Sequence, residues 1–180
     1  MAKRKAWLHI DLSGLKGDRI TLILLEHRDE LRDLGFKTPV HDPTEGHLAW
    51  LEMLRLHGEH GLRRRVVQGH WAEISRRAYK GSKVPLLSIP GFGAADPAQV
   101  ALILDILHGL KLNVVATVPA DPTPEQASTI EQALAGWQAK LKPDRLHRVP
   151  VAPGDWAAAW RGYAELVGLD AEGWVSATRT

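Results

Sequence analysis

The chain contains no cysteine and no long hydrophobic run, and these absences exclude several classes of protein. Without cysteine there can be no disulfide, thiolate zinc site, iron–sulfur cluster or cysteine nucleophile. No apolar stretch approaches the roughly 20 residues that a membrane-spanning helix needs. The basic residues Lys3 to Lys5 precede an alternating stretch and not the apolar core of a signal peptide. We therefore expect a cytoplasmic protein that does not enter a membrane.

The chain also lacks a large net charge, with 23 Lys and Arg against 21 Asp and Glu and a formal charge of +2. No global field therefore favours nucleic acid or anionic lipid. The basic residues are nevertheless concentrated between positions 55 and 83, and they include Arg63, Arg64, Arg65, Arg76 and Arg77. A solvated basic face is the ordinary explanation of such a stretch. A surface for an acidic partner is the alternative, and the near-neutral total argues against nucleic acid.

Familiar catalytic motifs are missing as well. There is no nucleophile elbow, no intact phosphate-binding loop of the Walker type and no aspartate-rich metal signature. His57 and His60 flank Gly58-Glu59, but this spacing is neither H-E-x-x-H nor H-x-x-E-H. If residues 46–60 form a helix, the two imidazoles share one face, which makes them weak candidates for adventitious metal binding.

What the sequence does contain is a regular alternation of strand and helix patterns. Its 180 residues, of which 44% are hydrophobic, suffice for a single domain over residues 1–180. Apolar runs predict strands at 7–11, 84–89, 112–118 and 146–151, and residues 168–180 form an expected C-terminal tail. Helical periodicity and capping residues predict helices at 20–34, 46–60, 71–78, 97–108, 124–141 and from Asp155 onward.

Strands separated by helices can pair in parallel only through crossover connections. The pattern therefore predicts a three-layer α/β/α fold with a mostly parallel central sheet. Ligands bind such sheets beyond the carboxyl ends of the strands. We expect the functional site to be formed by the loops at 11–17, 88–93 and 118–122.

Several segments resemble a known family when they are taken in order. They are Leu8-His9-Ile10, Glu26 to Leu31, Gly69-His70-Trp71, Val114 to Val118, Trp137-Gln138 and Leu146 to Val151. In this order they resemble the sulfotransferase-like P-loop proteins of actinobacteria. The resemblance implies a sulfotransferase-type P-loop fold. It also implies transfer of a sulfuryl group from 3′-phosphoadenosine 5′-phosphosulfate to the hydroxyl of a small-molecule acceptor.

The residues that would bind the sulfuryl donor differ from the family pattern. Where the family reads approximately Pro-Lys-Thr-Gly-Thr-Thr, this chain has Ser13, Gly14, Leu15, Lys16, Gly17 and Asp18. The resemblance makes Ser13, Gly14, Lys16 and Gly17 the donor-binding candidates. Asp11 and Asp18 bracket this loop, and their carboxylates would repel a dianionic donor.

Two further positions have lost the family's functional groups. Pro119 stands where the family has an arginine for the 3′-phosphate, and proline offers neither charge nor an N–H group. Ser88-Ile89-Pro90 ends a strand that in the family commonly ends in a glutamate able to act as a base. The leading hypothesis is therefore a degenerate, non-catalytic sulfotransferase-like protein that acts as a binding or interaction module and needs no cofactor.

Its partner would be another protein or a second copy of the chain. Trp156 and Trp160, four residues apart, are the candidates for an exposed aromatic face, although large aromatics in helices more often pack in the core. One alternative is an active sulfotransferase in which Lys16 and the loop hold the donor and His9, His27 or His70 acts as base. Another is an adaptor for nucleic acid or an acidic partner that uses the basic residues from Arg63 to Lys80.

Overall fold

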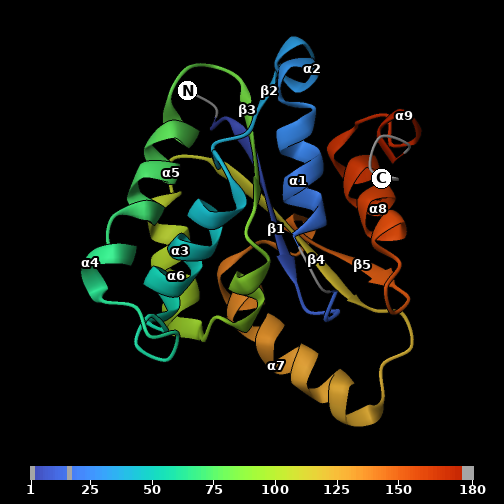
Figure 1. The fold of residues 1–180 in the computed structure, drawn as a ribbon. Helices are drawn as coiled ribbons and strands as arrows, with labels where there is room; N and C mark the ends of the chain where they lie inside the picture. Colours follow the sequence, from blue (N-terminus) through green and yellow to red (C-terminus); the bar gives the residue numbers. More distant parts are fainter. Residues whose placement is uncertain (1–2, 16–17, 176–180) are drawn as a thin grey trace.

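The computed structural model describes residues 3–15 and 18–175, and it places a parallel sheet between two layers of helices (Figure 1). Its strands run in the order β2-β3-β1-β4-β5, and each neighbouring pair is parallel. The strands are β1 (Lys5–Asp11), β2 (Phe36–Lys37), β3 (Val84–Ser88), β4 (Lys111–Pro119) and β5 (Leu146–Val151). The predicted α/β class and parallel sheet are confirmed. β2 was not predicted because two residues are too few to show a periodicity.

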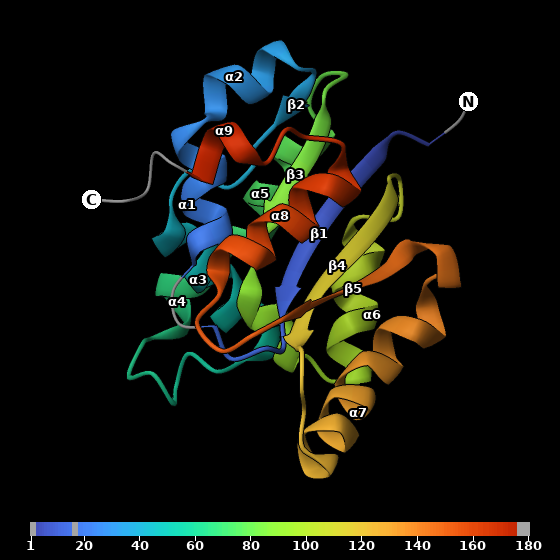
Figure 2. The ribbon, with the colours of Figure 1, turned by 90° about the vertical axis from the view of Figure 1, so that its right-hand side faces the viewer.

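Helices cover both faces of the sheet (Figure 2). On one face lie α1 (Arg19–Glu26), α2 (Arg28–Asp33), α8 (Trp156–Val167) and α9 (Glu172–Val175). On the other lie α3 (Pro43–Leu54), α4 (Arg64–Val67), α5 (His70–Tyr79), α6 (Pro97–Ile106) and α7 (Pro124–Lys140). Two short 3-10 helices are η1 (Pro90–Ala94) and η2 (Pro143–Arg145). None of the helices in the described ranges is long and apolar enough to cross a membrane.

Strand alternation divides the core into two clusters. Leu8 and Ile10 of β1 pack under α5, α6 and α7, whereas Trp7 packs under α1 and α8. Each cluster includes fully buried aromatic side chains, such as Trp137 in the first and Tyr163 in the second. Because successive side chains of a strand point to opposite faces, a central strand buried on both sides supplies both clusters.

The capping residues that the sequence predicted are present. Asp96 accepts a hydrogen bond from the backbone N–H of Gln99 at 2.8 Å, and the Gln99 side chain returns one to the Asp96 N–H. Thr123 begins α7 with the same reciprocal arrangement. These local hydrogen bonds satisfy N–H groups that have no partner inside the helix, so they fix where the helices begin.

Three predicted boundaries are wrong. The helix expected over 20–34 is divided at His27 into α1 and α2. The helix expected over 46–60 ends at Leu54, because Arg55 adopts the left-handed conformation with φ of 58°. Residues 168–175 are no tail, since Leu169 is buried and Trp174 packs against the cluster under α8. The remainder of the predicted tail, 176–180, lies outside the described residues.

Candidate functional site at the carboxyl edge of the sheet

The loops at 11–17, 88–93 and 118–122 follow three adjacent strands. β1 lies between β3 and β4, so the carboxyl ends of all three strands meet at one edge of the sheet (Figure 2). From β1 the chain continues into α1 on one face, and from β4 it continues into α7 on the other. A crevice forms where the connections of neighbouring strands leave to opposite faces, and it is the usual ligand site of such folds.

A chain of polar side chains crosses this edge. Nδ1 of His9 lies 2.9 Å from the hydroxyl of Ser88 on β3, and Nε2 lies 3.2 Å from the hydroxyl of Thr117 on β4. Thr117 donates to a carboxylate oxygen of Asp11, and Ser88 lies 3.4 Å from a carboxylate oxygen of Asp18. The pairing of β1 with β3 places His9 opposite Ser88, and its pairing with β4 places Asp11 opposite Thr117. Two carboxylates are thus connected through one imidazole.

The number of protons shared by these hydrogen-bonded side chains determines their net charge. Their four links each need a proton, whereas a neutral imidazole and two hydroxyls supply three. One additional proton therefore satisfies every link. Burial raises the pKa of Asp18 to about 6, although hydrogen bonds from Thr21 and Ser88 act against this rise. Burial lowers the pKa of His9 to about 4 against the attraction of Asp11, so His9 stays neutral and the additional proton binds to Asp18 only below about pH 6. At neutral pH Asp18 is therefore mostly ionised.

The loop after β1 directs its hydrogen-bond donors to the protein itself. The backbone N–H of Ser13 donates to Asp11 at 3.0 Å, and the N–H of Leu15 donates to the Ser13 hydroxyl at 3.4 Å. Gly93 of η1 lies so close that a Cβ atom there would come within 2.1 Å of the Asp11 carbonyl oxygen. Among the donor-binding candidates, Lys16 and Gly17 lie outside the described residues. Gly14 has a φ of +73° and is exposed.

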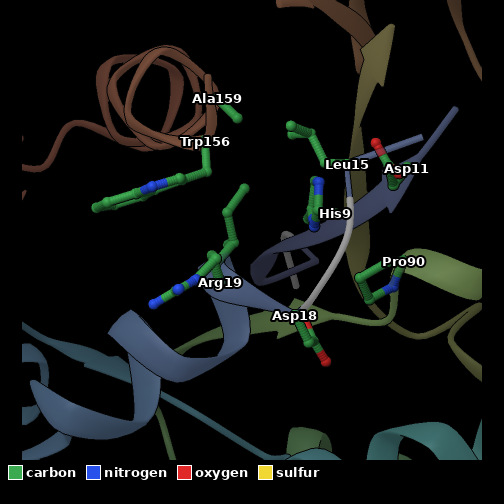
Figure 3. A pocket seen from close by; sticks show the side chains of 9 residues that line it. His9, Asp11, Leu15, Asp18, Arg19, Pro90, Trp156 and Ala159 are labelled. Atoms are coloured by element: carbon green, nitrogen blue, oxygen red, sulfur yellow. The ribbon is translucent and has the colours of Figure 1, made fainter. Parts of the chain in front are cut away.

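A small cavity lies beside the polar chain (Figure 3). Its volume of about 20 Å³ holds about one water molecule. The Arg19 guanidinium extends under the Trp156 ring, 5.6 Å from its centroid, and points away from His9. The lining side chains are His9, Asp11, Leu15, Asp18, Arg19, Ile20, Pro90, Trp156 and Ala159. This cavity is too small for a sulfuryl or phosphoryl group.

A wider groove of about 520 Å³ adjoins the cavity and shares Leu15, Asp18 and Pro90 with it. Trp50 forms one wall, and its buried indole nitrogen has no hydrogen-bond partner in the described part of the chain. The remaining lining residues are Pro43, Gly46, His47, Ile89 and Gly91. Among the described residues that line the groove, the titratable side chains are those of Asp18 and His47. Burial and the neighbouring His60 lower the pKa of His47.

A third hollow of about 310 Å³ lies on the other side of the loop. It is lined by Ser13, Gly14 and Pro119 together with residues at the start of α7, and Glu125 is its charged side chain among the described residues. The two hollows that flank the loop thus each contain a carboxylate, from Asp18 in the groove and from Glu125 here.

Of the three histidines expected as bases, the structure brings one to this edge. His9 lines the small cavity, as described above. His27 follows the far end of α1, about 12 Å along the helix from its start, where it stacks on Trp174 and contacts Glu30. His70 begins α5, with Nε2 3.1 Å from the Val66 carbonyl oxygen. His27 therefore lies too far from this edge to act there as the base, because α1 separates it from the loop after β1.

The two candidate metal ligands do not share a helix face. α3 ends before them, and His57 lines a groove beside Arg55 and Arg64, whereas His60 packs edge-on against Trp50. No group of three or more potential ligands is assembled among residues 3–15 and 18–175. The helical reasoning for this pair is therefore wrong.

The predicted basic face is divided. Arg63, Arg64 and Arg65 are exposed, and Arg76 is held by Glu73 on the same helix. Arg77 turns inward, where it pairs with Glu45 at 2.5 Å and donates to the Pro39 carbonyl oxygen. The five arginines consequently do not form one free surface.

The prediction of an exposed aromatic face is wrong for Trp160, one of its two residues. Trp160 is fully buried and donates through Nε1 to the Ala171 carbonyl oxygen at 3.2 Å. Trp156 is half-buried and lines the small cavity. One turn of helix separates the two residues, but the C-terminal segment around Trp174 covers the second of them.

Comparison of the chain with protein-family models, with curated proteins and with solved structures finds no match. The functional argument therefore depends on the geometry of the edge. Sequence reasoning missed the partnership of His9 with Ser88 and Thr117. The available signal was that each is a polar residue near the carboxyl end of an otherwise apolar strand.

Proposed function

We propose that the protein is a non-catalytic binding module on a sulfotransferase-type P-loop fold. The observation that supports this most strongly is the state of the loop after β1. Asp11 accepts the N–H and hydroxyl groups of Ser13, and Asp18 precedes α1, so side-chain carboxylates lie where the resemblance would put the phosphosulfate of the donor. An anion bound there would have to displace the protein's own anionic groups.

The magnitude of the repulsion supports the same conclusion. Two like charges 4 Å apart repel by about 1 kcal/mol in water and by about 4 kcal/mol at the effective dielectric of a protein surface. A dianion between Asp11 and Asp18 would experience this repulsion twice for each of its charges. The cavity has room for about one water molecule, so the donor could not move away from both carboxylates.

The wider groove is the ligand site in this proposal. Trp50, Pro43 and Pro90 offer apolar surface for the body of a small molecule. Asp18 accepts hydrogen bonds there. The ligand is therefore a small, largely apolar molecule that carries an amine or hydroxyl group rather than a phosphate.

Calorimetric titration with adenosine 3′,5′-bisphosphate at low salt tests the proposal. We expect neither heat nor a thermal shift up to millimolar concentrations. Micromolar binding that is lost in Lys16→Ala would overturn it and would restore the active sulfotransferase.

The groove itself is tested with a panel of small aromatic amines and alcohols. Binding is expected to change the fluorescence of Trp50, with Trp50→Phe as the variant that removes the signal. Matched aromatic carboxylates serve as the control, because Asp18 should exclude them. If amines and carboxylates bind equally well, the assignment of Asp18 as the recognition group is wrong.

A further inference from the structure

α2 and β2 lie at the opposite end of the sheet from the loop after β1 (Figure 1). A further cavity lies beside them. β2 pairs with the first two residues of β3, which places it at the amino end of that strand. The cavity has a volume of about 320 Å³, within the range of small-molecule sites. Its lining side chains are Arg28, Arg32, Lys37, Thr38, His41 and Lys83. Four cations from three segments of the chain thus line one hollow.

The intramolecular partners of these cations are mostly neutral. Arg28 donates to the Thr38 hydroxyl at 3.0 Å and to the Val40 carbonyl oxygen at 3.1 Å. Lys37 donates to the carbonyl oxygens of Arg77 and Lys80, which end α5, and Lys83 donates to that of Arg32. Carbonyl oxygens orient the side chains, but they do not neutralise their charge.

Carboxylates are scarce around this cavity. None of the described lining residues is acidic, and Arg32 pairs with Asp29 at 2.9 Å in an exposed contact. Such an exposed pair contributes little, because water screens it. In addition, burial and the neighbouring Arg4 lower the pKa of Lys37 to about 8, the direction expected where positive charge lacks a counter-ion.

Several donors remain for a ligand. A lysine ammonium has three N–H groups, of which Lys37 uses two in the contacts above and Lys83 uses one. Thr38 accepts its hydrogen bond from Arg28, so its own hydroxyl proton is available. The cavity therefore combines fixed positive charge with donors that are already oriented, which is the arrangement that phosphate oxygens require.

We propose that this cavity, formed by Arg28, Arg32, Lys37, Thr38 and Lys83, binds a dianionic phosphate group, either free or esterified to a small molecule. A phosphate offers several acceptor oxygens to donors that approach from α2, β2 and the start of β3. Its two negative charges offset cations that the described lining leaves without carboxylates. The site is distinct from the carboxyl edge, where the lining is acidic.

Titration calorimetry at constant ionic strength tests the site with inorganic phosphate and with glucose 6-phosphate. Saturable binding of either supports the proposal, and tighter binding of the ester shows that the remaining volume contacts the rest of a phosphorylated molecule. Sodium chloride at the same ionic strength controls for general screening. Absence of saturable binding by both probes overturns the proposal.

Matched variants separate a site from a general charge effect. Arg32→Gln with Lys83→Gln removes two cations of the cavity and should weaken binding at least tenfold. Arg63→Gln with Arg64→Gln removes two exposed cations elsewhere and should leave binding within twofold. An equal loss in both pairs would show that phosphate responds only to total charge, and the proposal would be wrong.

A measurement on the unaltered protein keeps the test valid if the first pair fails to fold. Phosphate added to isotopically labelled protein should shift the backbone amide resonances of residues 28–41 and 83 first. Shifts confined to other regions would overturn the assignment.

Discussion

The two ends of the sheet carry opposite charge, although the whole chain is nearly neutral. At the carboxyl edge, Asp11 and Asp18 border a cavity that holds about one water molecule. At the other end, Arg28, Arg32, Lys37 and Lys83 line a larger and open hollow. The edge at which α/β proteins ordinarily bind anions thus repels them here, and an unrelated position attracts them. A net charge of +2 conceals this separation.

The largest expected effect concerns the packing of the carboxyl edge. Gly93→Ala places a Cβ atom 2.1 Å from the Asp11 carbonyl oxygen, so the backbone of β1 or η1 must move. We expect a loss of about 3 kcal/mol or more in the free energy of unfolding, measured by urea denaturation. Gly58→Ala meets no atom within 4 Å and serves as the control. Similar stabilities of the two variants would mean that this edge is not closely packed.

The next prediction concerns how Asp18 and His9 make the free energy of unfolding depend on pH. The pKa of Asp18 is raised to about 6, so its contribution to stability falls as the pH rises from about 4 to about 6, by about 3 kcal/mol. The pKa of His9 is lowered to about 4, so its contribution falls by a similar amount as the pH falls from about 6.5 to about 4. In the unaltered protein the two slopes oppose each other.

Single variants should reveal each slope. Asp18→Asn should lose stability on acidification, because His9 then acts alone. His9→Asn should gain stability over the same interval, because Asp18 remains. Denaturation at pH 4, 5, 6 and 7 measures both. Parallel pH profiles for the two variants and the unaltered protein would show that these groups do not titrate in this range.

A third prediction concerns removal of the negative charge that distinguishes the carboxyl edge from the other end of the sheet. Asp11→Asn with Asp18→Asn removes the two carboxylates from the carboxyl edge. In the adjoining groove of about 520 Å³, which has room for a phosphate, we expect weak binding of adenosine 3′,5′-bisphosphate to become detectable. The reason is that each like charge removed at 4 Å relieves about 1 kcal/mol of repulsion even in water. Calorimetry measures the change. Absence of binding by a folded double variant would mean that charge does not keep the anion out of the groove.

The smallest effect distinguishes structural cations from free ones. Glu45→Gln removes the charge opposite the half-buried Arg77 and should cost about 1.5 kcal/mol of stability. Glu73→Gln removes the partner of the exposed Arg76 and should leave stability unchanged within error. Thermal unfolding compares the two variants. If the two variants have equal stability, the ion pair of Arg77 contributes no more than that of the exposed Arg76. The basic stretch would then be one exposed surface.

Much of the fold could be predicted because its signals are local. The buried runs of β1, β3, β4 and β5 and the capping boxes at Asp96 and Thr123 are readable within a few residues. The αL conformation of Arg55 was not readable, since left-handed conformation is commonly a glycine signal. β2 was missed because its two residues form a strand only through their pairing with Val84 and Pro85.

The sequence predicted which loops form the candidate site, but it did not predict which side chains are accessible there. Three loops were expected to meet, and they do, because parallel strands that are neighbours share a carboxyl edge. The interaction roles of Trp160 and Arg77 failed because burial depends on which segment covers a helix. For Trp160 that segment is the turn around Ala171, and for Arg77 it is the chain near Pro39 and Glu45.

The sequence by itself determined the α/β class, most helix starts and the presence of Asp11 and Asp18 around the loop that follows the first strand. These features depend on hydrogen bonds and periodicity within one or two turns. The tertiary structure alone decided that His9 contacts both Ser88 and Thr117, and that Arg28, Arg32, Lys37 and Lys83 line one cavity. Both arrangements join residues far apart in the chain, and strand order and register, which no local pattern encodes, bring them together.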